Sequence, residues 1–114
     1  MMVEFRACGH SLKINPRGSY VQTLKLPRAA RILSVQQERK FLSLDRRIIM
    51  WEIHDVKNER DLEDRCFVLV MTGLSIELSS YSEVHYLGTI QHSSQVIYHA
   101  YEVDVTDHQV VKRN

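Results

Sequence analysis

The chain has 114 residues, of which 44% are hydrophobic and 25% charged, a balance that fits one soluble globular domain and not two. Its longest apolar run, residues 66–71, is too short to cross a bilayer, and its start lacks a signal-peptide core. From these features we expect no membrane span and no secretory signal. We therefore expect a cytoplasmic protein with no membrane partner.

The net charge of +1 hides a concentration of positive charge in the first third of the chain. Residues 1–40 hold eight basic and two acidic residues, which leaves that third at about +6 and the remainder at about −5. One interpretation is a basic face that binds nucleic acid or an acidic partner. The other is that the strands fold back on one another and mix the charges. We favour mixing, because nucleic-acid-binding modules usually raise the charge of the whole domain.

Apolar and polar residues alternate with a period of two, which predicts strands along most of the chain. Residues 1–17 are expected to form an N-terminal extension. The first predicted strand, at 18–26, ends at Pro27, because proline cannot donate to a sheet ladder. Further strands are expected at 31–37, 47–56 and 65–72, followed by a hairpin within 83–103.

The pattern within these strands also predicts the core and the fold. Residues 65–72 are apolar on both faces, as a central strand covered on both sides should be. The charged segments 38–47 and 57–64 are expected to be surface inserts or loops. The residues expected to be buried are Trp51, Phe67, Leu69, Ile90 and Ile97. We therefore predict one mainly β domain, an antiparallel β-sandwich or a curled barrel-like sheet of about five to six strands.

The predicted hairpin carries three of the six histidines, His85, His92 and His99. A loop centred on residues 93–94 gives the opposed pairs Ile90–Ile97, Gly88–His99, Tyr86–Tyr101, Val84–Val103 and His85–Glu102. In this register His85 and His99 point to opposite faces, and only a one-residue slip would bring them together. We therefore expect a structural role for His99 and no metal site in the hairpin.

Motifs for catalysis or cofactor binding are absent from the sequence. It contains no Gly-rich phosphate loop, nucleophile elbow or H-E-x-x-H helix. Cys8 and Cys66 are far apart, which suggests reduced thiols, and a structural zinc site usually needs more thiolates. We expect a non-enzymatic protein with no catalytic residue, cofactor or metal.

Several segments resemble a family of small phage and prophage proteins, over about residues 20–104. The most specific elements are an LP-x-x-A-x-I-L-S-V-Q segment and a Y-x-G-T-x-Q segment. The matching stretches are "VQTLKLPRAARILSVQQ" (21–37), "MWEIHDV" (50–56), "RCFVLVMTG" (65–73), "YLGTIQ" (86–91) and "VIYHAYEV" (96–103). The resemblance implies a phage origin but no activity. The chain departs from the family pattern at 1–17 and 38–47, and the family's repeated histidine matches His99.

We expect a non-enzymatic phage accessory protein that binds a host protein or ribonucleoprotein complex in the bacterial cytoplasm, for example an inhibitor of a defence system such as CRISPR. Two alternatives stay open: nucleic-acid binding through residues 1–40, and a minor virion or scaffold component. Partner binding is expected in segment 38–47, through its cationic side chains Arg39, Lys40, Arg46 and Arg47. The alternative for this segment is a solvated hairpin whose apolar residues complete the core.

Overall fold

The computed structural model describes residues 3–14, 21–39 and 46–105, and all structural statements below refer to them. They form seven strands: β1 (Phe5–Leu12), β2 (Val21–Pro27), β3 (Arg31–Arg39), β4 (Arg46–Asp55), β5 (Leu62–Met71), β6 (Tyr81–Gln91) and β7 (Ile97–Val105). A single 3-10 turn, η1 (Val56–Asn58), follows β4. These residues include no helix long and apolar enough to cross a membrane.

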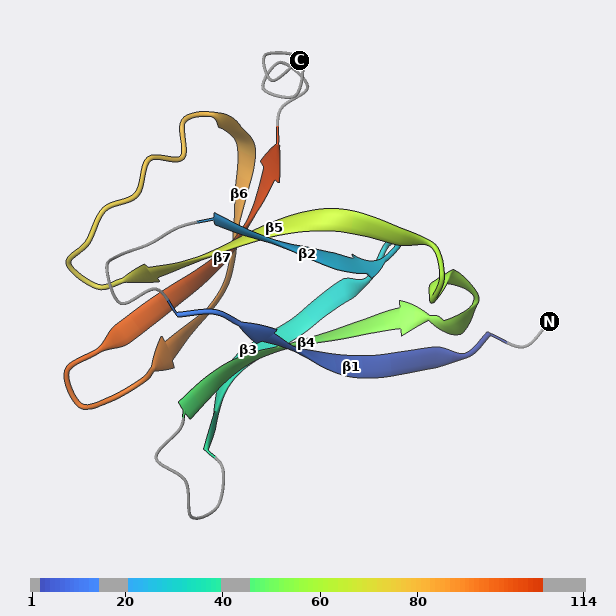
Figure 1. Cartoon of the computed structure of the whole chain (residues 1–114), viewed down its shortest axis with the longest axis horizontal. Helices are drawn as coiled ribbons and strands as arrows, with labels where there is room; N and C mark the ends of the chain where they lie inside the picture. The colour runs from blue at the N-terminus through green and yellow to red at the C-terminus, as the bar shows by residue number, and fades with distance from the viewer. Residues whose placement is uncertain (1–2, 15–20, 40–45, 106–114) are drawn as a thin grey trace.

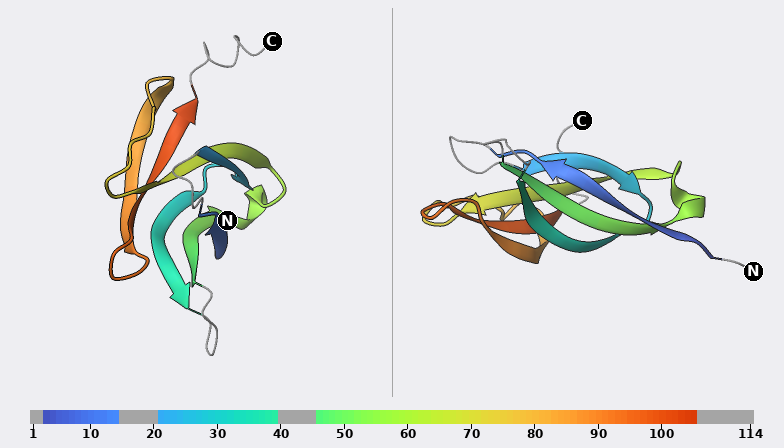
Figure 2. Two further views of the ribbon diagram at one scale, coloured as in Figure 1. Left: turned by 60° about the vertical axis from the view of Figure 1, so that its left-hand side comes forward. Right: turned by 90° about the horizontal axis from the view of Figure 1, so that it is seen from below.

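The strands build two antiparallel sheets that face each other (Figures 1 and 2). Sheet A has the order β1-β4-β3, and sheet B has the order β2-β5-β7-β6. The predicted β-sandwich is confirmed, whereas the barrel-like alternative and the count of five to six strands are wrong. The unexpected strand is β1, which lies inside the predicted N-terminal extension and pairs with β4 along its whole length.

The central position of β5 is confirmed, because it lies between β2 and β7 in sheet B. The charged segment 57–64 is not a loop throughout, since it forms part of η1 and the first residues of β5. Of the predicted core residues, Phe67, Leu69 and Ile90 are buried, Ile97 is half-buried and Trp51 is exposed. The three buried residues, Phe67, Leu69 and Ile90, pack with Leu26, Ile48, Met50, Tyr98 and Ala100 between the sheets.

The prediction that Trp51 is buried, which would turn its face of β4 toward the core, is wrong. Ile48 and Met50 are fully buried, whereas Trp51 is 37% exposed and faces away from sheet B. The inward face of β4 continues with Glu52 and His54, both of which are buried. Because Glu52 and His54 are polar, the apolar pattern of this segment predicts that the opposite face, which carries Trp51, points toward the core.

The predicted hairpin register is confirmed near the open end and wrong near the turn. Tyr86 pairs with Tyr101, with ring centroids 5.6 Å apart, and His85 pairs with Glu102. A bulge between Tyr86 and Gly88 then shifts the pairing by one residue. Gly88 consequently lies opposite Ala100, and Ile90 lies opposite Tyr98, in place of the predicted His99 and Ile97.

Gly9 is the residue that allows Trp51 to lie flat across β1. A Cβ atom at Gly9 would lie 2.9 Å from a ring atom of Trp51. We expect Gly9→Ala to push the indole outward, to cost about 1–2 kcal/mol of stability, and to shift tryptophan emission to the red. Trp51 is the chain's one tryptophan, so fluorescence reports this contact directly. Gly88→Ala is the control, because a Cβ atom there would lie 4.0 Å from the carbonyl oxygen of Val35. Unchanged emission in Gly9→Ala would contradict the contact.

Candidate functional site

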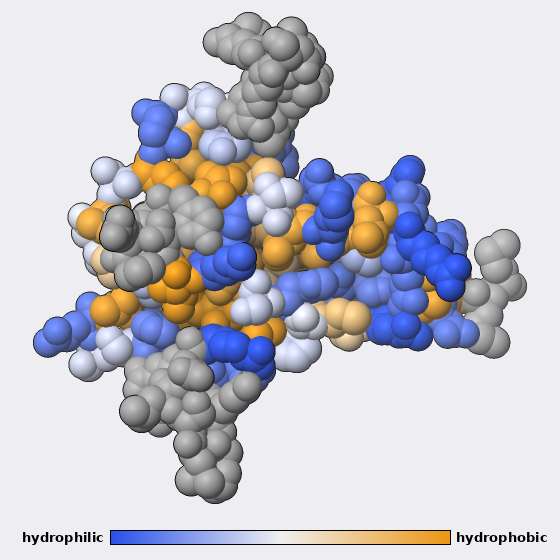
Figure 3. Space-filling model, in the orientation of Figure 1, coloured by the Kyte–Doolittle hydropathy of each residue, from blue (hydrophilic) through white to orange (hydrophobic). Residues whose placement is uncertain are grey.

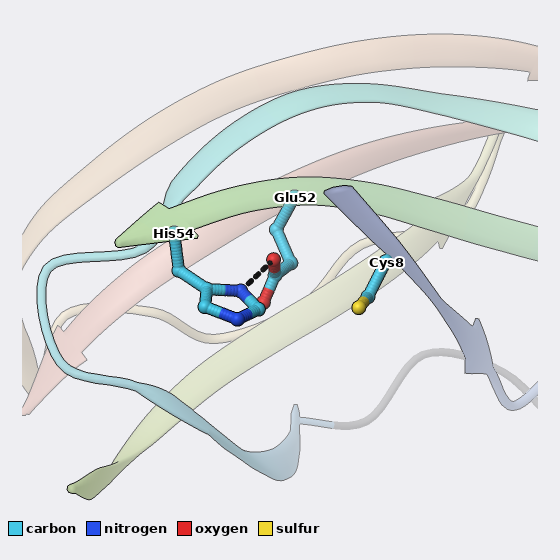
Figure 4. A group of neighbouring side chains, drawn as sticks. All are labelled: Cys8, Glu52 and His54. Atoms are coloured by element: carbon cyan, nitrogen blue, oxygen red, sulfur yellow. Dashed lines mark hydrogen bonds and ion pairs between the residues drawn. The ribbon is translucent and has the colours of Figure 1, made fainter. Parts of the chain in front are cut away.

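A group of polar side chains from β1 and β4 faces the interior of the sandwich. Cys8 lies directly opposite Glu52 in the β1–β4 ladder, and Arg6 lies opposite His54. Residues two apart in a strand share a face, so Cys8 and His10 point to the same side as Glu52 and His54. Figure 4 shows Cys8 reaching from β1 toward the pair on β4. We call Cys8, His10, Glu52 and His54 the polar cluster.

Glu52 is the centre of the polar cluster and has no solvent-exposed surface. One carboxylate oxygen, Oε1, lies 2.7 Å from Nδ1 of His54, and the other, Oε2, lies 3.4 Å from Nε2 of His10. Burying a carboxylate is costly unless it is paired and hydrogen-bonded. Within the described residues its side chain pairs with these two imidazoles and with no lysine or arginine. Among the described residues, the side-chain partners of this buried carboxyl group are therefore histidines alone.

The far side of the His54 ring is held by a second carboxylate. Its Nε2 lies 3.2 Å from Oε1 of Glu59, and the same oxygen lies 2.6 Å from a guanidinium nitrogen of Arg6. The hydrogen bond to Glu52 raises the pKa of His54 above its ordinary value. Burial opposes this rise, and the bond to Glu59 adds to it. The ring is thus fixed in orientation by carboxylates on both nitrogens.

An open pocket of about 310 Å³ connects the polar cluster to solvent. Its other wall comes from sheet B, through residues of β2 and the start of β5. The pocket is lined by Arg6, Cys8, His10, Lys25, Pro27, Glu52, His54, Glu59 and Leu62. A small ion or molecule can therefore reach the cluster without opening the sandwich.

The arrangement matches a set of metal ligands better than a nucleophile with its base. Donor atoms of Cys8, Glu52 and His54 all lie within 4.8 Å of one another. A cysteine hydrolase needs its thiol hydrogen-bonded to a histidine. No such bond is found between Cys8 and the imidazoles within the described chain. Thiolate, imidazole and carboxylate are instead the donors that bind transition metals in proteins.

The three hairpin histidines have separate partners. His85 lies 3.0 Å from Glu83 and 3.3 Å from Asp104 on the surface of sheet B. His92 lies 2.8 Å from Gln37. His99 bridges Thr72 and Thr89, at 2.9 and 3.0 Å, which fits the structural role predicted for it.

Of the predicted partner-binding residues, Arg39, Arg46 and Arg47 lie where β3 ends and β4 begins. Arg39 and Arg46 are register partners where the two strands meet. Arg47 forms an ion pair with Glu38 at 2.7 Å and is half-exposed. Lys40 lies outside the described residues. Partner binding by this set stays a prediction.

Basic residues of the first third are matched by acidic residues that follow β4. Lys25 pairs with Asp64 at 2.9 Å, and Arg28 pairs with Asp61 at 2.8 Å, as Arg6 does with Glu59. Figure 3 shows hydrophilic residues gathered at this end of the molecule. These pairs agree with the expectation that folding mixes the charges of the two parts.

Large apolar side chains on the outer face of sheet A are exposed to solvent. Phe5 is 63% exposed and Leu33 is 52% exposed, and they share this face with Trp51. Leu33 turns outward because the β3 ladder shifts by one residue between Ile32 and Ser34. We call Phe5, Leu33 and Trp51 the outer apolar face. Sequence patterning missed it, because it placed Trp51 in the core.

A second pocket, of about 520 Å³, adjoins the outer apolar face at Phe5. Its lining includes three basic residues, Arg28, Arg31 and Lys57. Arg31 lies opposite Ile53 and forms no ion pair with another described residue. This cation is therefore available to a partner that covers the outer apolar face.

The fold and these surfaces define a small antiparallel β-sandwich with a polar cluster inside and an apolar face outside. Residues 10–110 match the family model described as a domain of unknown function (DUF7352), so the chain belongs to that family. No curated protein and no solved structure matches the chain.

Proposed function

We propose that this protein is a non-enzymatic phage accessory protein that binds a host protein in the bacterial cytoplasm and inhibits a defence system such as CRISPR. The observation that carries the proposal is the outer apolar face of sheet A. Three large apolar side chains exposed on one face of a sheet mark an interaction surface more often than a solvent-facing sheet.

The charges around the outer apolar face favour a protein partner with acidic residues. Arg47 follows the same alternation along β4 as Trp51 and lies toward one end of the strand, while Arg31 lies beside Ile53 toward the other. An apolar centre with arginines at its rim is typical of protein–protein interfaces. Arg31 would pair with a carboxylate of the partner, and the apolar side chains would be covered by its apolar surface.

The first alternative, nucleic-acid binding through residues 1–40, receives less support. Arg6, Lys25 and Arg28 are already paired with carboxylates, so they present little free positive charge to a phosphate backbone. A gel shift that weakens steeply with salt would favour this alternative over a protein partner.

The partner surface can be tested with matched double variants in affinity purification from infected host cells. We expect the wild type to recover one specific host protein or complex and Phe5→Ser/Leu33→Ser to lose it, because both residues are exposed and their removal leaves the core intact. Val84→Ser/Tyr86→Ser, on exposed apolar residues of β6, is the control. Arg46→Glu/Arg47→Glu tests the predicted cationic set in the same assay. Equal recovery with both apolar pairs would remove the outer apolar face from the interface.

The inhibitory activity has its own readout. In a host whose CRISPR system targets a phage, expression of the wild type should raise the plating efficiency of that phage. The Phe5→Ser/Leu33→Ser variant should not do so. An unchanged plating efficiency with the wild type would contradict CRISPR inhibition, and co-purification with phage particles would favour a virion component.

A further inference from the structure

We infer that the polar cluster binds a divalent transition-metal ion, with Zn²⁺ as the best match, through Cys8, His10, Glu52 and His54. The inference goes beyond the proposed function, because the cluster faces the interior of the sandwich and the outer apolar face lies on the other side of sheet A. Four features of the cluster support metal binding: the chemistry of the donor atoms, their spacing on the two strands, the contacts that hold His54, and the pocket that opens onto them.

The donor set is the kind that Zn²⁺ prefers. Zinc in proteins is bound by thiolate, imidazole and carboxylate in a tetrahedral arrangement, and the cluster supplies one thiol, two imidazoles and one carboxylate. With the thiol ionised and the imidazoles neutral, the ligands carry two negative charges, which a divalent ion neutralises. The ion would therefore remove the cost of a buried carboxylate that now depends on histidines alone.

The strand geometry brings the donors close to coordination distances. Zinc bonds of roughly 2.0–2.3 Å place tetrahedral ligand atoms about 3.3–3.8 Å apart. The donor atoms of Cys8, Glu52 and His54 lie within 4.8 Å of one another, and His10 lies 3.4 Å from Glu52. The two-residue spacing of C-x-H in β1 and E-x-H in β4 keeps all four side chains on one face. His10 stands outside this group of three, so its side chain would have to move toward Cys8 and His54 to complete the site.

His54 has the outer support that metal-binding histidines usually have. A ligating imidazole commonly donates its other N–H to a carboxylate, which fixes the ring and strengthens the metal bond. Here Nδ1 faces Glu52, while Nε2 donates to Glu59, which Arg6 holds at 2.6 Å. The Glu59–Arg6 pair therefore positions His54 without itself touching the metal.

The pocket beside the polar cluster gives an ion access to the thiol of Cys8. The pocket of about 310 Å³ opens onto all four ligands. Cys8 is a half-buried free thiol. Among the described residues, a second group of close donors, Glu83, His85 and Asp104, is exposed and lacks a thiol, so it serves as the control site.

The test titrates metal-free full-length protein with Zn²⁺ in competition with a chromophoric chelator, and with Co²⁺ followed by absorbance. We expect one equivalent of Zn²⁺ bound with sub-micromolar affinity. The Co²⁺ complex should show a sulfur-to-metal charge-transfer band and the intense visible bands of a tetrahedral site. Because the charge-transfer band requires a thiolate ligand, it shows in the wild type that Cys8 or Cys66 binds the metal.

Variants assign the ligands. Cys8→Ser should abolish the charge-transfer band and weaken Zn²⁺ binding by about 100-fold or more, whereas Cys66→Ser, which removes the other free thiol, should change neither. Glu59→Gln should weaken binding by about 10–100-fold and keep the band, as expected for a positioning residue. The inference is overturned if the wild type shows no charge-transfer band, or if Zn²⁺ binding survives Cys8→Ser and is lost in His85→Gln.

Discussion

Phe67→Ala is expected to lower the free energy of unfolding by about 3–5 kcal/mol, the largest loss from any single substitution considered for this chain. Phe67 has no exposed surface and is among the largest of the fully buried side chains. It lies on the central strand of sheet B, where its ring packs between the two sheets. The truncation removes apolar contacts and leaves a cavity that neighbouring strands on both sides prevent from closing. Urea denaturation followed by Trp51 fluorescence measures the loss.

A matched substitution on β5 shows whether the loss of stability comes from the burial of the side chain or from the lower strand propensity of alanine. Leu62 begins β5 and is 50% exposed, so Leu62→Ala should cost less than about 1 kcal/mol. If Phe67→Ala cost no more than Leu62→Ala, the enclosed position of Phe67 would be wrong.

The parts of the fold that sequence patterning predicted are those where the core is purely apolar. Segment 65–72 is apolar on both faces, and it forms the central strand β5 as expected. The end of β2 at Pro27 follows from the missing amide hydrogen. The open end of the hairpin followed from the aromatic pair of Tyr86 and Tyr101, because one face of that register is continuously apolar.

Sequence patterning failed where polar side chains point inward. Strand β1 was read as an extension, because its inward positions include Cys8 and His10 in place of aliphatic residues. On β4 the face of Trp51 was predicted to be buried, because the face that is buried carries the polar residues Glu52 and His54. Violations of local rules are expected at functional sites, and here both errors fall on the four residues of the polar cluster. The two-residue spacing of C-x-H and E-x-H was the signal that could have found it.

The exposure of Leu33 and the hairpin bulge were missed for a different reason. Leu33 is exposed because the β3–β4 ladder shifts by one residue, and the second shift, after Tyr86, changes the pairing of His99. A bulge depends on how two strands twist and pack against the opposite sheet. The period-two pattern of one strand carries no information about such a shift.

Arg65→Met is expected to destabilise the fold by about 2–4 kcal/mol. Arg65 donates from Nε and Nη2 to the two carboxylate oxygens of Glu102, at 2.6 and 2.7 Å, and from Nη1 to the carbonyl oxygen of Ala30. Both side chains are largely buried, at 16% and 13% exposure. The guanidinium thus joins β5 to β7 and to the turn that precedes β3. Without it, Glu102 would be a buried charge with no cation, and the Ala30 carbonyl would lose this donor.

The loss of stability in Arg65→Met comes from the carboxylate of Glu102, which is left buried without its cation. Removing both side chains should therefore destabilise the fold less than removing Arg65 alone. Arg65→Met/Glu102→Leu should therefore be more stable than Arg65→Met alone, in urea denaturation of the single and double variants side by side. Lys25→Met is the control, because the Lys25–Asp64 pair spans neighbouring strands of the same sheet but is 69% and 61% exposed; its loss should stay below about 1 kcal/mol. A double variant at least as unstable as the single one would mean that the pair itself, and not the unpaired carboxylate, holds these strands together.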